Sequence, residues 1–229
     1  MDTLVDLVRQ GATRFDRKPA LMIRPFFRTR SWRYRDLAKQ TARVARVLHD
    51  AGIREGDRVI LWAVNRPEWG ISFFAIAHLG AVSVPLDVRH TVDFGRKIVG
   101  QTEAKLVIAS RQTEAAAKEL GLPMLFVETL PDLARRVEPI EPANVTKTSL
   151  AEIVFTSGTT GEPKGAMLSH GNLMASATAM TSVLEFGPED RLLSVLPLSH
   201  LYEQVLGFMA PLTVGASVVY PVSRQPAVL

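Results

Sequence analysis

The stretch that decides the fold class is residues 56–87, GDRVILWAVNRPEWGISFFAIAHLGAVSVPLD. It opens with the apolar, β-type run RVILWAV and closes with a second such run, AVSVP. Between the two runs, Asn65 followed by a proline and by Glu68 marks the start of a helix, and Gly80 marks its end. A strand, a helix and a strand within about 28 residues form a βαβ unit, so we expect parallel strands joined by a right-handed crossover.

The same alternation extends in both directions from this unit. Upstream we expect a short N-terminal helix, a strand or hairpin in FFRTRSWRY and a helix over 35–51 that Gly52 ends. Downstream the expected helices are 91–101, 113–120, 170–184 and one starting near Leu201, and the expected strands are 105–110, 123–128, 151–155, 191–196 and 216–221. This order predicts an α/β fold with mostly parallel sheets and flanking helices.

Three prolines divide the chain into parts. Pro131, Pro139 and Pro142 interrupt any regular element and mark a connection over 131–150. We therefore expect a first α/β subdomain at 1–130 and a second part at 151–229.

Composition narrows the class of protein. The 229 residues are 47% hydrophobic and carry a net charge of +4, which excludes a disordered or fibrous chain. No cysteine is present, so disulfides, a thiolate nucleophile and cysteine-ligated metals are excluded within this chain. The start MDTLVDLVRQ does not resemble a signal peptide, and no apolar stretch reaches the length of a membrane span. We expect a cytoplasmic protein.

Residues 156–165, TSGTTGEPKG, follow the apolar run AEIVF and hold three glycines, four hydroxyls and one lysine. Glycines let a backbone turn and approach a ligand closely, while hydroxyls, amides and the ammonium of Lys164 donate to an anion. The spacing matches neither the common P-loop nor the Rossmann glycine fingerprint. The segment predicts a phosphate-binding loop, and a flexible surface turn is the alternative.

This decamer and the MLSHGNL that follows resemble the phosphate-binding signature of the adenylate-forming (AMP-binding) superfamily. Residues 56–87 resemble the early βαβ region of that family, and LPLSHLYEQ at 196–204 resembles the start of its acyl site, closest to long-chain fatty acyl-CoA synthetases. The resemblance runs from about residue 31 to residue 221. It implies the N-terminal part of such an enzyme, with an incomplete acyl-CoA synthetase-like large domain.

The resemblance also implies an activity: an ATP-dependent acid–thiol ligase that forms an acyl-adenylate and pyrophosphate, then a thioester with coenzyme A. A fatty acid and ATP would be its substrates, and Mg²⁺ would bridge phosphate oxygens. By similarity Lys164 neutralises the leaving pyrophosphate and Thr156 lies near the metal. The phosphate-binding residues implied are Thr156, Ser157, Gly158, Thr159, Thr160, Gly161, Glu162, Pro163 and Lys164.

His200 is the second catalytic candidate, because the family places a histidine or aromatic residue there, beside the acyl group and the adenylate. From the residues alone, a histidine that caps or packs against the following helix is the simpler interpretation. No GxSxG elbow is present, and Ser199 adjoins His200, which argues against a Ser-His-Asp hydrolase. Ser169, with His170 and Asn172 behind it, is expected to cap a helix.

Three further histidines, His49, His78 and His90, stand at spacings that suit no metal cluster. The arginine-rich segment RTRSWRYR is interpreted as a strand or hairpin with a solvated basic face, with peripheral contact at an anionic inner-membrane surface as the alternative. We expect no nucleic-acid partner.

Family segments for adenine, ribose and the catalytic lysine of a C-terminal domain have no counterpart in these residues. We therefore expect no complete turnover by this chain alone, and we expect self-association or a partner segment to cover exposed apolar surface. Fatty acyl-AMP ligases and the adenylation domains of peptide synthetases are the alternatives within the class. A non-catalytic module that binds nucleotide phosphates or regulates another chain is the alternative outside it.

Overall fold

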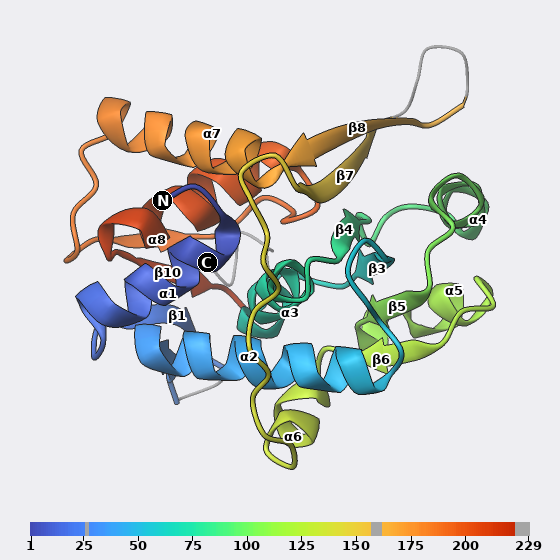
Figure 1. Ribbon diagram of the computed structural model, residues 1–229, viewed down its shortest axis with the longest axis horizontal. Helices are drawn as coiled ribbons and strands as arrows, with labels where there is room; N and C mark the ends of the chain where they lie inside the picture. The colour runs from blue at the N-terminus through green and yellow to red at the C-terminus, as the bar shows by residue number, and fades with distance from the viewer. Residues whose placement is uncertain (26–27, 157–161, 223–229) are drawn as a thin grey trace.

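The computed structural model describes residues 1–25, 28–156 and 162–222, which build two sheets and the helices around them (Figure 1). The larger sheet has the strand order β6-β5-β3-β4-β7-β8 and the smaller one β2-β1-β10-β9. The strands are β1 (Pro19–Ile23), β2 (Arg30–Arg33), β3 (Arg58–Trp62), β4 (Val82–Pro85), β5 (Leu106–Ala109), β6 (Met124–Phe126), β7 (Leu150–Thr156), β8 (Lys164–Ser169), β9 (Arg191–Leu193) and β10 (Ser217–Tyr220). The helices are α1 (Leu4–Phe15), α2 (Tyr34–Asp50), α3 (Pro67–His78), α4 (Val92–Thr102), α5 (Glu114–Lys118), α6 (Leu130–Ala134), α7 (His170–Val183) and α8 (Ala210–Val214).

The central βαβ unit is confirmed. Strand β3 pairs in parallel with β4 on one side and with β5 on the other. Four of its five residues are buried, as expected for a strand that is covered on both faces. The α/β fold with mostly parallel sheets and flanking helices is therefore the observed architecture.

Helix α3 lies at the centre of the molecule, and every one of its residues is buried. It contacts β3 and β4 of the larger sheet and β1 of the smaller sheet. The ring of Phe208 packs edge-on against Trp69 and in a tilted contact with Phe74, with centroid separations of 6.4 and 5.0 Å. A Cβ at Gly70 would lie 2.8 Å from the Phe208 ring, so this close approach requires glycine. The aromatic cluster thus joins the two sheets through one helix.

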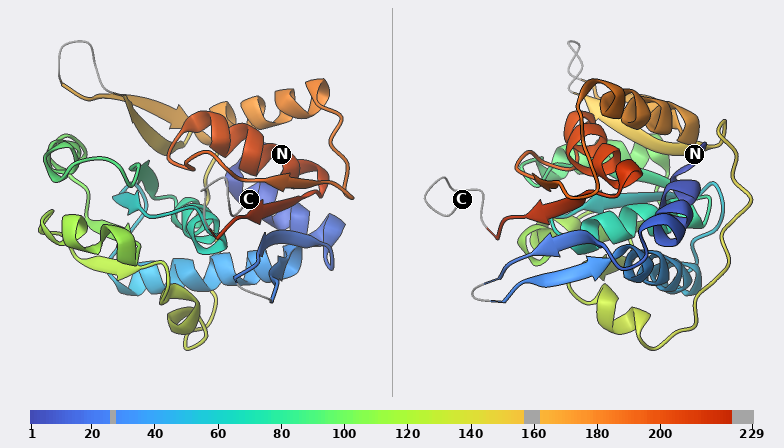
Figure 2. Two further views of the ribbon diagram at one scale, coloured as in Figure 1. Left: turned by 180° about the vertical axis from the view of Figure 1, so that it is seen from behind. Right: turned by 90° about the vertical axis from the view of Figure 1, so that its left-hand side faces the viewer.

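The smaller sheet pairs a strand from near the start of the chain, β1, with a strand from near the end of the described residues, β10. Strand β10 pairs in parallel with β1 and with β9, and β2 pairs antiparallel with β1. The hairpin expected in FFRTRSWRY is therefore present in part as β2, with Phe26 and Phe27 outside the described residues. Figure 2 shows β1 and β2 side by side on the opposite side of the molecule from α7.

Several expectations about local structure are wrong. Asn65 does not cap α3: the N-cap is Arg66, and Asn65 makes long-range contacts instead. The connection over 131–150 is not entirely irregular, because α6 begins at its edge with a proline in its first turn. The helix expected near Leu201 is present, and it contains a π-helical stretch, Glu203–Met209, before α8. Such stretches arise where an extra residue is accommodated, often near a site.

Strand β8 was not expected either. It pairs antiparallel with β7, so the two form a hairpin that extends beyond the rest of the larger sheet in Figure 1. Gly165 lies within β8, opposite Phe155, and not in the turn. A Cβ there would lie 2.9 Å from the Ile153 and Phe155 side chains, so a larger residue would require them to shift. Among the described residues, no helix is long and apolar enough to cross a membrane.

Candidate functional site

The hairpin β7–β8 carries the predicted phosphate-binding segment. Thr156, at the end of β7, stands opposite Lys164, at the start of β8, and both are exposed. Pro163 is buried, and Glu162 pairs at 2.8 Å with Lys97 of α4. The pairing brings the hydroxyl-bearing and cationic ends of the motif together at one end of the hairpin.

Five of the predicted phosphate-binding residues lie outside the described part of the chain. They are Ser157, Gly158, Thr159, Thr160 and Gly161. The four described members stay predictions as site residues, and the structure adds their position: they flank the hairpin turn and face solvent, except for Pro163.

The base of the hairpin is fixed by a capping arrangement. Ser169 Oγ accepts from the Asn172 amide at 3.2 Å, and Asn172 Oδ1 accepts from the Ser169 amide at 3.0 Å, so the predicted N-cap of α7 is confirmed. His170 is buried and its Nδ1 accepts from the Leu4 amide at 3.2 Å. Burial lowers the pKa of His170 to about 4, which leaves it neutral. Its role is structural, as expected.

His200 lies about half exposed at the turn before the last helix and contacts a buried carboxylate. Its Nε2 is 3.1 Å from Asp87 Oδ2, and Arg89 donates to both Asp87 oxygens at 2.9 and 2.7 Å. Burial alone would raise the pKa of Asp87, but the hydrogen bonds and charge of Arg89 hold it well below its usual range. Because an ionised carboxylate only accepts, the contact with Asp87 is a hydrogen bond when Nε2 carries the ring proton, and Arg89 also lies 3.4 Å from the same nitrogen.

Asn65 holds the backbone that leads to His200. Its Nδ2 donates to Ser194 Oγ at 3.1 Å and to the Leu196 carbonyl at 2.6 Å. Its Oδ1 accepts from the Leu198 amide at 2.9 Å. One side chain therefore fixes the 194–198 segment to the turn after β3, and Asp87 fixes the ring that follows it.

Sequence reasoning missed Asn65, Asp87 and Arg89 as contributors to this region. The strand order, which the structure provides, explains their position: the chain leaves β3 toward β4 on one side and later returns to β5 on the other. Ligands in open α/β sheets bind at the carboxyl ends of strands where the order reverses in this way. Asn65 follows β3 and Asp87 follows β4, so both lie at that position.

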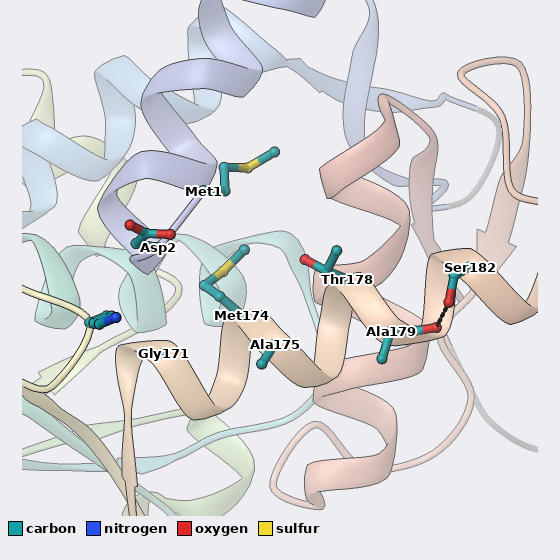
Figure 3. A pocket seen from close by; sticks show the side chains of 9 residues that line it. Met1, Asp2, Gly171, Met174, Ala175, Thr178, Ala179 and Ser182 are labelled. Carbon is teal, nitrogen blue, oxygen red and sulfur yellow. Dashed lines mark hydrogen bonds between the residues drawn. The ribbon is translucent and has the colours of Figure 1, made fainter.

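A separate hollow of about 490 Å³ lies between the N-terminus and α7. Figure 3 shows that Met174, Thr178 and Ser182 line it along one side of the helix. Neither the hairpin residues nor His200 contribute to its wall. Its lining side chains are mostly small or apolar and bring few polar groups together, so we do not assign the substrate site to it.

The strand order, the exposed hairpin of Thr156 and Lys164 and the turn that contains His200 belong to one α/β architecture. The AMP-binding enzyme family matches residues 8–229, and the chain belongs to this family. Oxalate--CoA ligase of Arabidopsis thaliana is 29% identical over 98% of this chain and 46% of its own length. Long chain acyl-CoA synthetase 7, peroxisomal, from the same plant is 31% identical over 81% of this chain and 31% of its own length.

Solved structures agree on the fold. The inhibitor-bound N-terminal domain of FACL13 from Mycobacterium tuberculosis aligns with a TM-score of 0.85 at 26% identity, over 96% of this chain and 57% of that one. A Mycobacterium tuberculosis fatty acyl CoA synthetase aligns with a TM-score of 0.86 at 25% identity, over 96% of this chain and 45% of its own. This chain thus spans less than half the length of the curated relatives described above.

Proposed function

We propose that this chain is the N-terminal segment of an ATP-dependent ligase that activates long-chain fatty acids as acyl-adenylates and passes them to coenzyme A. Membership of the AMP-binding family supports the adenylate-forming class. The fatty-acid assignment rests on the segment LPLSHLYEQ, and the peroxisomal long chain relative is consistent with it.

The observation that carries the proposal is the hairpin geometry. Thr156 and Lys164 face each other across the strand pair at the solvent-exposed end, where a polyphosphate has access to both. An ammonium there offsets the negative charge that builds on pyrophosphate as it leaves, a type of stabilisation that contributes strongly to catalysis. The carboxylate and the nucleotide are both anions, so holding them together requires this positive charge.

Magnesium fits this arrangement as a phosphate-bound ion. The described residues contain no group of three or more acidic or histidine side chains able to hold a metal by themselves. Its ligands would then be phosphate oxygens, with the Thr156 hydroxyl as the protein contribution. Bound there, the ion would supply Lewis-acid polarisation of the phosphates.

His200 is proposed to lie beside the acyl group. Asp87 contacts its ring, and Asn65 binds the segment that leads to it at the carboxyl-end edge of the sheet. The ring is half exposed, so the residue is both positioned and accessible. A preorganised polar group costs less to position when the substrate arrives.

The alternatives differ in the acceptor or in the presence of catalysis. A fatty acyl-AMP ligase or a peptide-synthetase adenylation segment would use the same hairpin, and a phosphate-binding regulatory module would use it without turnover. ATP–pyrophosphate exchange and acyl-CoA formation, both measured on the ligase that contains this segment and on the chain alone, separate them. Exchange distinguishes the acid that is activated, and thioester formation with coenzyme A distinguishes a CoA ligase from a fatty acyl-AMP ligase. We expect exchange that depends on long-chain fatty acid for the ligase and none for the chain alone. Exchange driven by amino acids, or none at all in the ligase, would contradict the proposal.

A further inference from the structure

Glu152, in the middle of β7, is fully buried. It stands four residues before Thr156, so it lies on the strand that carries the candidate phosphate hairpin. An isolated carboxylate in such surroundings is costly, because no water solvates it. Burial therefore favours the uncharged, protonated form of this side chain.

Within residues 1–25, 28–156 and 162–222, one side chain is hydrogen-bonded to the Glu152 carboxyl group. Gln204, in the π-helical stretch after His200, donates its Nε2 to Glu152 Oε1 at 2.7 Å and is itself fully buried. Two buried oxygens, Glu152 Oε2 and Gln204 Oε1, have no hydrogen-bond donor among the described residues. Ionised, the carboxylate leaves both oxygens unsatisfied, whereas a single proton on Glu152 supplies the missing donor for the pair.

The charged groups around the pair give the ionised form no support. Strand β4 contributes Ser83 opposite Glu152, and β8 contributes Leu168, both uncharged. Glu203, which adjoins Gln204 in the π-helical stretch, is another acid, and His170, which begins the α7 helix that contacts β7, is neutral. Burial raises the pKa of Glu152 to about 8, and the Gln204 hydrogen bond lowers it only in part.

We propose that Glu152 is a neutral carboxylic acid at neutral pH that pairs side by side with the Gln204 amide, and that this pair is a positioning device for His200. The acid accepts from Gln204 Nε2 and donates from Oε2 to Gln204 Oε1. The backbone amide of Gln204 in turn donates to the His200 carbonyl at 3.1 Å. These hydrogen bonds therefore connect β7, the first strand of the phosphate hairpin, to the turn that contains His200.

The consequence for the site rests on the proposed function. Nucleotide phosphates and acyl group must meet at a fixed separation, and the Glu152–Gln204 pair joins the two segments proposed to hold them. Glu152 touches neither ligand in this account, so it acts through the placement of His200. Its effect is expected on geometry near His200 and not on the chemistry of the hairpin.

The test compares the wild-type chain with Glu152→Gln, which keeps a pairing amide, and Glu152→Leu, which cannot pair. Infrared difference spectra at pH 7 should show a protonated carboxyl band in wild type that Glu152→Gln removes. Because the folded pKa is raised, wild-type stability should fall as pH rises from about 4.5 to about 8, by up to tenfold in the folding equilibrium constant per pH unit. Glu152→Gln should lack this component.

The placement of the His200 ring is measured separately. Ring NMR signals of His200, assigned with His200→Gln, should shift in Glu152→Leu and stay in place in Glu152→Gln. No carboxyl band difference, parallel pH curves for wild type and Glu152→Gln, or an unmoved His200 signal in a folded Glu152→Leu would each overturn the proposal. None of these measurements uses nucleotide or acid, so a failure here is separate from a failure of the proposed ligase activity.

Discussion

The hairpin end of the site and the histidine end are built in opposite ways. At the hairpin, Thr156 and Lys164 are close in sequence and exposed to solvent. At the histidine end, Asp87 contacts His200 and Asn65 binds the 194–198 segment before it, and both partners are more than a hundred residues away in the chain. The hairpin motif is local, so its exposed side chains become ordered only when a ligand binds. His200 depends on long-range contacts that position it before any ligand binds.

The largest expected effect falls on the hairpin. Lys164→Ala in the ligase that contains this segment should lower the rate of ATP–pyrophosphate exchange by about 10² to 10³-fold, because charge on the leaving pyrophosphate loses its partner. Lys97→Ala is the matched control: it removes a nearby surface lysine that pairs with Glu162, and little change is expected. Equal losses in the two variants would show that general positive charge matters and not the position of Lys164.

The histidine end should respond in stability. Asn65→Ala removes three hydrogen bonds and leaves the Leu198 amide without its acceptor, so urea unfolding should show a loss of about 2 kcal/mol. Asn144→Ala, at an exposed loop asparagine, should stay within about 0.5 kcal/mol of wild type. If Asn65→Ala left the free energy of unfolding unchanged, other contacts would hold the 194–198 segment.

These two regions also show what can be predicted from a sequence. The motif at 156–165 and the cap at Ser169 are local, so residue type and spacing were enough to predict a cap that the structure confirms. The βαβ unit was predicted because its apolar runs are long and end at clear turn residues. Asn65 suited a helix cap equally well, and only the packing of the two sheets determines that it binds the 194–198 segment.

Two further misses have physical causes. Strand β8 reads KGAMLS, with a glycine and weak alternation, and its strand conformation comes from pairing with β7. The Asp87–His200 contact joins turns after β4 and β9, and a single sequence contains no signal for such a pair beyond the strand order itself. The division of the chain near 131–150 stays a prediction.

A smaller effect is expected at the base of the hairpin. Ser169→Ala removes the N-cap of α7 and should cost about 1 kcal/mol in thermal or urea unfolding. Ser176→Ala, exposed within the same helix, should be neutral or slightly stabilising because alanine favours helix. If both serines behave alike, the cap does not hold the hairpin base.

The weakest expected effect is association through the surface next to His200. Leu193, Leu196 and Tyr202 are 49%, 45% and 65% exposed, which is apolar area that favours contact with another chain. Sedimentation velocity should show a sedimentation coefficient that rises with concentration in the micromolar range, and Tyr202→Ser should reduce the rise. Val183→Ser, 74% exposed at the end of α7, is the control. A monomer at all concentrations would contradict the expectation.

The central claim is that the β7–β8 hairpin binds the polyphosphate of a nucleotide. The direct measurement is a titration of the ¹⁵N-labelled chain with Mg²⁺–ATP, followed by backbone amide signals. We predict shifts concentrated at residues 156–164, absent in Lys164→Ala and reproduced in part by inorganic tripolyphosphate. Saturable ATP binding that leaves those amides unmoved and shifts signals elsewhere in the chain would contradict it.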